Sequence, residues 1–141
     1  MNLKEVLRLE KIINIKTKAK AEFIDITEEV TRAIKESGIN DGIAYIFVPH
    51  TTAGITINEG ADASVKGDIL RMLNKLVPYD GDYSHAEGNS PAHIKSTLTG
   101  VSLFVIIKEG KLVLGTWQSI FFCEFDGPRH RKAIIKIVKG S

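Results

Sequence analysis

The chain has 141 residues, of which 43% are hydrophobic and 26% are charged, and its formal net charge is only +2. This length and apolar content suit one soluble globular domain over residues 1–141 and exclude an intrinsically disordered chain. The small net charge gives no reason to expect a nucleic-acid or membrane partner. Because there is a single cysteine, Cys123, and no apolar run typical of a signal peptide or a membrane span, we expect a cytoplasmic protein.

Apolar patterns predict the elements of the first third of the chain. Alternation of apolar residues predicts a strand over Val6–Ile15. A helix should follow, with Asp25 as its N-terminal cap and Gly38 as its C-terminal stop. The β-branched and aromatic run Ile43–Val48, bounded by glycine and proline, predicts a buried strand.

The middle of the chain predicts a strand, two helices and a long loop. Thr51–Asn58 is expected to be extended, and a helix with one apolar side should run from about Ala61 to Leu76. Proline, glycine, aspartate and tyrosine predict a loop over Val77–Asn89. A short helix should then begin with Ser90 as its cap and end at Gly100.

The remainder of the chain predicts strands only. Val101–Ile107 and Lys111–Leu114 flank one turn, and Thr116–Phe125 and Lys132–Val138 flank another. Strands therefore dominate, with two or three helices inserted among them. We predict an α+β fold, a mostly antiparallel β-sandwich.

Three histidines occupy positions from which side chains can reach a common site. His50 directly follows a predicted buried strand, His85 lies in the long loop, and His93 lies in the first turn of the helix after that loop. Three histidine ligands with an open fourth position are the usual layout of a catalytic zinc ion. Their spacing matches no standard metal motif, however, and from spacing alone ordinary surface or core histidines are the favoured interpretation.

Charged residues near these histidines have two interpretations each. Glu59 and Glu87 could act as general bases, although Glu59 stands before a predicted helix, where a carboxylate is favourable on its own account. Arg129 and Arg131, after a predicted turn, could clamp a phosphate or be solvated turn charges.

The predicted strand Thr116–Phe125 has polar residues on an apolar face. Period-two alternation places Gln118 and Glu124 on the same side, where an apolar core would reject them unless they were partnered. They are therefore expected to line a site or a subunit interface. Cys123, on the other side among phenylalanines, is expected to be a small buried hydrophobic residue and not a nucleophile.

Five blocks of sequence, in order, resemble the YjbQ-type family, small proteins of which some are described as secondary thiamine-phosphate synthases. The blocks are His50–Gly60, Tyr83–Asn89, Ala92–Lys95, Gly115–Gln118 and Glu124–Arg129. The resemblance covers essentially the whole chain. It implies a YjbQ-like α+β fold built around a β-sandwich, and a homotrimer.

The resemblance also implies a site. A metal ion, with zinc as the first choice, would be held by His50, His85 and His93. Glu59 or Glu87 would transfer protons. The residues expected to contact the substrate are Thr51, Asn58, Asn89, Lys95, Gln118 and Arg129.

The implied activity joins a pyrimidine pyrophosphate to a thiazole phosphate, giving thiamine phosphate and pyrophosphate. Since Mg²⁺ on oxygen ligands is the usual partner of pyrophosphate, Mg²⁺ is the alternative to zinc. Two other functions stay open: a metal-dependent hydrolase, to which a three-histidine site is well suited, and a metal-binding trimer without catalysis.

Overall fold

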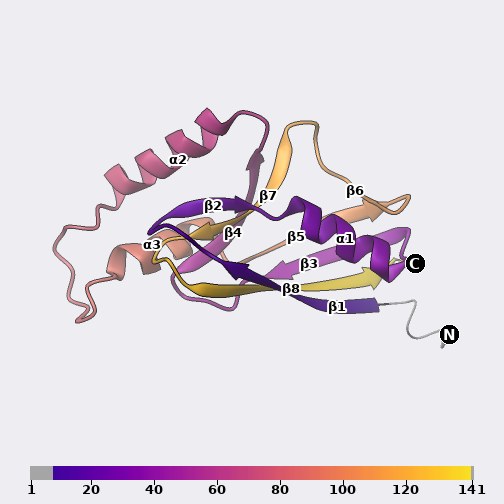
Figure 1. Cartoon of the computed structure of the whole chain (residues 1–141), viewed down its shortest axis with the longest axis horizontal. Coiled ribbons are helices and arrows are strands. Elements are labelled where there is room, and N and C mark those ends of the chain that lie inside the picture. The colour runs from indigo at the N-terminus through magenta and orange to yellow at the C-terminus, as the bar shows by residue number, and fades with distance from the viewer. Residues whose placement is uncertain (1–7, 141) are drawn as a thin grey trace.

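The structure is a computed structural model that describes residues 8–140 (Figure 1). In that range the chain forms eight strands and three helices. In chain order they are β1 (Arg8–Lys16), β2 (Glu22–Asp25), α1 (Thr27–Ser37), β3 (Asp41–Phe47), β4 (Ala53–Glu59), α2 (Ala63–Leu76), α3 (Ser90–Thr99), β5 (Ser102–Lys108), β6 (Lys111–Leu112), β7 (Gln118–Glu124) and β8 (His130–Lys139).

The strands form two sheets, and all strand pairs in the described range are antiparallel. Sheet A has the order β1-β8-β3-β5-β6, and sheet B has the order β2-β7-β4. The predicted α+β fold with a mostly antiparallel sandwich and a few helices is therefore confirmed.

The main core lies between the two sheets and under α1. Alternate residues of β3 and β8, such as Ile46 and Ile135, point inward from sheet A, and Ile55 and Phe122 point inward from sheet B. Val30 belongs to the apolar side of α1 that closes this core. The sequence predicted Ile43–Val48 as a buried strand from its continuous apolar run, but β3 buries only alternate residues and leaves Tyr45 and Phe47 exposed on the outer face of sheet A.

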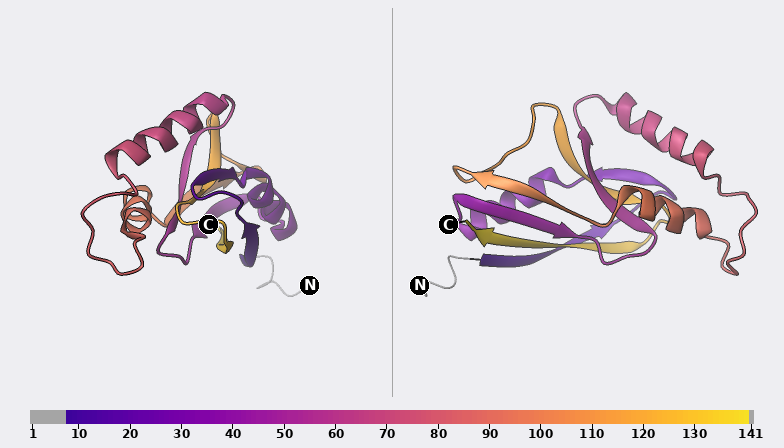
Figure 2. Two further views of the ribbon diagram at one scale, coloured as in Figure 1. Left: turned by 60° about the vertical axis from the view of Figure 1, so that its left-hand side comes forward. Right: turned by 180° about the vertical axis from the view of Figure 1, so that it is seen from behind.

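A second, smaller apolar cluster lies on the other face of sheet B. It contains Phe121, Cys123 and Phe125, which pack against Ala92 of α3 and the partly buried side of α2. Figure 2 shows α2 and α3 on this side of the molecule, with α1 at the opposite end. Strand β7 is thus covered on both faces, and Cys123 is a buried hydrophobic residue as the sequence predicted.

Sheet A leaves its outer face open to solvent. Phe104 and Ile106 of β5 are 59% and 51% exposed, and Tyr45 lies opposite Phe104 in the register. Ile12 and Phe47 extend the exposed apolar area across the sheet. A contiguous apolar face of this kind is typical of a contact surface with another molecule.

One local expectation is wrong, and two features of the strands were not predicted. The four-residue strand β2 was not predicted, since only Phe23 in it is fully buried and the run is too short to show a period. The strands around the last predicted turn do not pair, because β7 belongs to sheet B and β8 to sheet A. Asp25 does not stand at the N-cap of α1: Ile26 does, and Asp25 Oδ1 accepts the N–H of Thr27 at 2.9 Å.

The start of α3 also differs from the prediction. Asn89, and not Ser90, is the N-cap of α3, and its side chain makes no capping bond. The positions Val6 and Leu7 of the first predicted strand lie outside the described residues. Among the helices of the described range, none combines the length and the apolar character needed to cross a bilayer.

Candidate active site

Residues from four separate segments line one pocket of about 480 Å³, which we call the histidine pocket. The segments are the loop between β3 and β4, the loop before α3, the first turn of α3, and the turn leading into β8. The lining residues are Pro49, His50, Thr51, Thr52, His85, Glu87, Asn89, His93, Arg129 and Arg131. The fold therefore brings together the three histidines that the sequence singled out.

His85 and His93 lie next to each other in this pocket. Their ring centroids are 5.5 Å apart and the ring planes meet at 86°. Two imidazoles bound to one tetrahedral zinc ion, with zinc–nitrogen bonds of about 2.0–2.1 Å, would have centroids about 5 Å apart. The observed separation is compatible with two ligands of one metal ion, and it is equally that of an ordinary edge-to-face ring contact.

His50 uses one ring nitrogen for the fold itself. Its Nε2 accepts the backbone N–H of Lys132 at 3.0 Å, which ties the β3–β4 loop to β8. Burial lowers the pKa of His50 and the charge of Arg131 lowers it further, against the opposing effect of Glu124. A neutral imidazole that accepts at Nε2 bears its proton on Nδ1.

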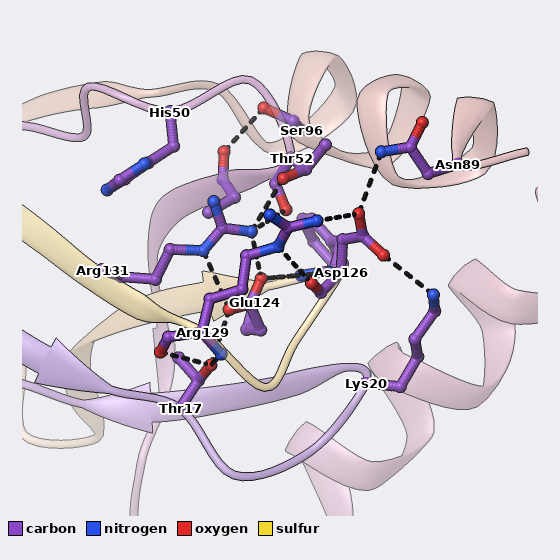
Figure 3. A network of polar contacts seen from close by, with 12 residues as sticks. Thr17, Lys20, His50, Thr52, Asn89, Ser96, Glu124, Asp126, Arg129 and Arg131 are labelled. Atoms are coloured by element: carbon purple, nitrogen blue, oxygen red, sulfur yellow. Dashed lines mark hydrogen bonds and ion pairs between the residues drawn. The ribbon is translucent and has the colours of Figure 1, made fainter. Parts of the chain in front are cut away.

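A buried ion pair with Glu124 holds the pocket residue Arg131 in place (Figure 3). Arg131 donates from Nε to Glu124 Oε1 at 2.9 Å and from Nη2 to Glu124 Oε2 at 2.5 Å. Glu124 is 0% exposed, and its carboxylate also accepts the hydroxyl of Thr17 at 2.7 Å. Burial would raise the pKa of Glu124, but the hydrogen bonds from Arg131 and Thr17 outweigh it and lower the pKa.

A second carboxylate, Asp126, organises the rim of the pocket. It accepts hydrogen bonds from Lys20 at 2.8 Å, from Asn89 Nδ2 at 2.9 Å and from Arg129 Nη2 at 2.9 Å. Burial opposes ionisation, but these hydrogen bonds dominate and lower the pKa of Asp126 to about 2. Asn89 is held in one orientation by this contact, and its Oδ1 is buried with no partner in the described part of the chain.

The three-histidine metal centre is not assembled within one chain. Across residues 8–140, no three side chains of histidine, cysteine, aspartate or glutamate lie close enough to hold a metal ion together. His85 and His93 fit two ligand positions, but His50 has its Nε2 committed to Lys132. The metal site stays a prediction. Of the three predicted ligands, His85 and His93 are the two whose rings lie next to each other.

Several other predicted site residues lie away from the histidine pocket. Glu59 pairs with Gln118 in the β4–β7 register, at the opposite end of sheet B from the pair Ala53–Glu124. Over the six residue steps from Ala53 to Glu59, a strand rises by about 20 Å. Asn58 and Glu59 serve local turns: Asn58 Oδ1 accepts the N–H of Glu59 at 2.7 Å, and Glu59 Oε2 accepts the N–H of Ala61 at 2.6 Å.

Lys95 is also outside the pocket. It is 0% exposed, its Nζ donates to Asn74 Oδ1 at 2.6 Å, and it lies 3.7 Å above the centre of the Tyr79 ring. Burial, with a contribution from Lys20, lowers the pKa of Lys95 to about 8. Its substrate role stays a prediction, and this enclosure gives it no surface in the pocket.

Beyond the histidines, four predicted site residues lie in the lining of the pocket, whereas the sequence did not identify the partners of two carboxylates beside it. Thr51, Glu87, Asn89 and Arg129 all line the pocket. Glu124 was expected to need a partner, but nothing in the sequence identified Arg131 on the other sheet as that partner. Asp126 resembled an ordinary turn residue, and its three side-chain partners come from three different segments.

Comparisons with known proteins agree on one family. A family model described as UPF0047 protein YjbQ-like matches residues 11–140. A UPF0047 protein of Methanocaldococcus jannaschii is 59% identical over 124 residues, which cover 88% of this chain and 90% of the relative. The UPF0047 protein YugU of Bacillus subtilis is 52% identical over 129 residues, covering 91% and 98% of the two chains.

A solved structure shows the same fold. The crystal structure of an uncharacterised YjbQ/UPF0047-family protein from Clostridium acetobutylicum superimposes with a TM-score of 0.90 at 57% sequence identity. The match covers 91% of this chain and 99% of that one.

Proposed function

Because the chain belongs to the YjbQ-like UPF0047 family, we propose that its histidine pocket is the active site of an enzyme that acts on a phosphorylated small molecule. The observation behind this proposal is the adjacent pair His85 and His93 in a pocket whose wall contains Arg129 and Arg131. Imidazoles supply proton transfer or metal ligation near neutral pH, and guanidinium groups bind phosphoryl oxygens.

The reaction we propose is the one that the resemblance implies: a pyrimidine pyrophosphate and a thiazole phosphate combine to thiamine phosphate. Pyrophosphate leaves with the electron pair of the bond that breaks, so the site must neutralise the charge that develops on it. Arg129, which is half exposed in the lining of the pocket, would do so. The thiazole ring nitrogen forms the new bond with its own lone pair and has no proton to lose, so Glu87 would transfer a proton to the leaving pyrophosphate.

A divalent metal, zinc or alternatively Mg²⁺, is part of this proposal. His85 and His93 would hold it, and Glu87 lines the same pocket. The ion would supply Lewis-acid stabilisation of negative charge on the substrate. The nitrogen donors favour zinc, since Mg²⁺ prefers oxygen ligands.

The same donor set supports a second candidate, a metal-dependent hydrolase. Zinc with histidine ligands is a common arrangement for hydrolysis, and the loop that provides His85 is open to solvent. The two candidates differ in whether water or a second substrate accepts the transferred group. They can therefore be separated by their products.

The test is a product assay on the purified protein. The two thiamine precursors are incubated with wild type, with His93→Ala, and with His130→Ala as the matched control, because His130 is exposed and does not line the pocket. We expect wild type and His130→Ala to form thiamine phosphate at similar rates, and His93→Ala to lose about 100-fold or more of the rate. Equal rates in all three would contradict the proposal.

Two further experiments distinguish the hydrolase from the metal-binding protein without catalysis. A panel of phosphoesters and amides replaces the precursors to test the hydrolase. Metal analysis of wild type, His85→Ala and His93→Ala tests the ligand pair, with loss of bound metal expected in both variants. Bound metal without any turnover, and a lower melting temperature once it is removed, would indicate the non-catalytic alternative.

We also propose that the open face of sheet A is the contact between copies in a homotrimer. The support is the exposed apolar side chains of Tyr45, Phe47, Phe104 and Ile106, together with the trimer that the resemblance implies. Burying such side chains is the main driving force of stable association. Phe104→Glu should lower the mass measured by light scattering after size-exclusion chromatography to that of one chain, whereas Lys108→Glu at the end of the same strand should keep it.

A further inference from the structure

Arg131 is a buried arginine whose Nη1 group has no hydrogen-bond partner among the described residues. It is 7% exposed, and its Nε and Nη2 bind Glu124, while Nη2 also donates to Thr52 Oγ1 at 2.7 Å. These contacts fix the plane of the guanidinium group. In the described residues no acceptor lies at Nη1, which Figure 3 shows on the side of His50, and Arg131 lines the pocket.

His50 presents a second free donor to the same space. Its Nε2 is occupied by the N–H of Lys132, so its proton lies on Nδ1, for which the described residues offer no acceptor. Both His50 and Arg131 belong to the lining of the histidine pocket. Two rigidly held donors therefore face a cavity without a partner in the protein.

The charges around these donors leave room for an anion. Lys20, Arg129 and Arg131 form ion pairs with only two carboxylates, Glu124 and Asp126. Arg129 also uses only Nε and Nη2 in protein contacts, which leaves its Nη1 free at the rim. The network itself has one positive charge in excess, with Glu87 as a further carboxylate in the pocket lining, and it has unused N–H groups on three side chains.

We infer that Arg131 and His50, with Arg129 at the rim, form a subsite for a phosphoryl group. A terminal phosphoryl group has three oxygens and can accept from all three side chains, whereas a carboxylate has two oxygens in one plane. This assignment rests on the proposed function for its reaction, and it gives His50 the role of an anion donor in place of a metal ligand. The His85–His93 pair would then face the reacting part of the same substrate.

The experiment is a calorimetric titration with pyrophosphate, inorganic phosphate and succinate at fixed ionic strength. The variants are Arg131→Lys, His50→Gln and the control Arg32→Lys on the exposed side of α1. We expect pyrophosphate to bind wild type and Arg32→Lys equally, and to bind Arg131→Lys about tenfold or more weakly, since a charge-assisted hydrogen bond is lost. His50→Gln should weaken it by several-fold, and succinate should bind worst.

A measurement on wild type covers the case in which Arg131→Lys fails to fold. Pyrophosphate should then shift the amide resonance of Lys132, whose N–H is bonded to His50, and leave that of Arg32 in place. The inference is overturned if pyrophosphate does not bind wild type, or binds a folded Arg131→Lys or His50→Gln as tightly as wild type.

The outcomes for the subsite and for the proposed function are distinguishable. Binding that depends on Arg131 without turnover of any substrate would support the subsite and contradict the enzyme. Turnover that Arg131→Lys leaves unchanged would support the enzyme and overturn the subsite.

Discussion

The two ends of sheet B hold polar residues of similar kinds in opposite physical states. At the end near the turn into β8, Glu124 is fully buried and shares a network with Arg131. At the other end, Glu59 and Gln118 are paired in the register, and their side chains bind neighbouring backbone N–H groups. The polar residues of β4 and β7 therefore stabilise the residues around the pocket at one end of sheet B and local turns at the other end.

The difference teaches where function can be expected. Buried polar groups need partners, and partners from distant segments fix the geometry of a cavity in advance. Polar groups bonded to the next turn fix only that turn. The two ends of sheet B should therefore differ in their contribution to the free energy of unfolding as they do in structure.

Glu124→Ala should give the largest effect. It removes the partner of Arg131 and leaves that guanidinium group buried and unpaired, which should cost about 3–5 kcal/mol of unfolding free energy. Urea denaturation measures this. The matched change at the other end of sheet B, Glu59→Ala, is the control. If both variants lost the same free energy of unfolding, the buried network would contribute no more to stability than a local turn.

Asp126 predicts how the pocket end responds to acid. Its pKa is lowered to about 2 from the ordinary 3.8, so its stabilising contribution is present above the unfolded pKa and is lost as the pH falls toward 2. Relative to Asp126→Asn, wild type should be more stable by about 1–2 kcal/mol at pH 7. Melting curves from pH 7 to pH 2 should show this advantage shrinking below pH 4; a constant difference would contradict the ion pairs with Lys20 and Arg129.

The sequence predicted the elements well and their lateral contacts poorly, for a physical reason. The apolar run Ile43–Val48 shows in its own composition that a strand forms there, and β3 does, although Tyr45 and Phe47 in it are exposed. The bond between Glu124 and Arg131 depends on β7 and β8 leaving their turn into different sheets, which no local pattern reports. For the same reason, the order of motif residues along the chain could not show that Glu59 lies far from the histidines.

Lys95 of α3 lies at neither end of sheet B, and its burial gives a separate prediction. The pKa of Lys95 is lowered from 10.5 to about 8, which means that the folded state disfavours the charged side chain. Between pH 8 and pH 10.5 the unfolded chain holds this proton and the folded chain does not, so the free energy of unfolding increases as the pH rises through this range. Lys95→Met should therefore be more stable than wild type by about 1–2 kcal/mol at pH 7, with the gain disappearing near pH 10.

Thermal unfolding at pH 7 and pH 10 checks this, with Lys75→Met on the exposed end of α2 as the control. A destabilised Lys95→Met at pH 7 would show that the contacts with Asn74 and Tyr79 outweigh the cost of burying the charge.

Gln118→Ala should have the smallest effect on the stability of the chain. Its Oε1 accepts only the N–H of Gly115, at 2.7 Å, and the side chain is exposed, so we expect a loss of about 0.5 kcal/mol or less. Urea denaturation and the product assay are run on the same preparation. A small loss of stability with unchanged turnover would confirm that this end of sheet B only shapes its own turn. A tenfold loss of turnover at unchanged stability would instead show that Gln118 reaches a histidine pocket, which at a distance of about 20 Å along the strands requires the pocket of a neighbouring copy.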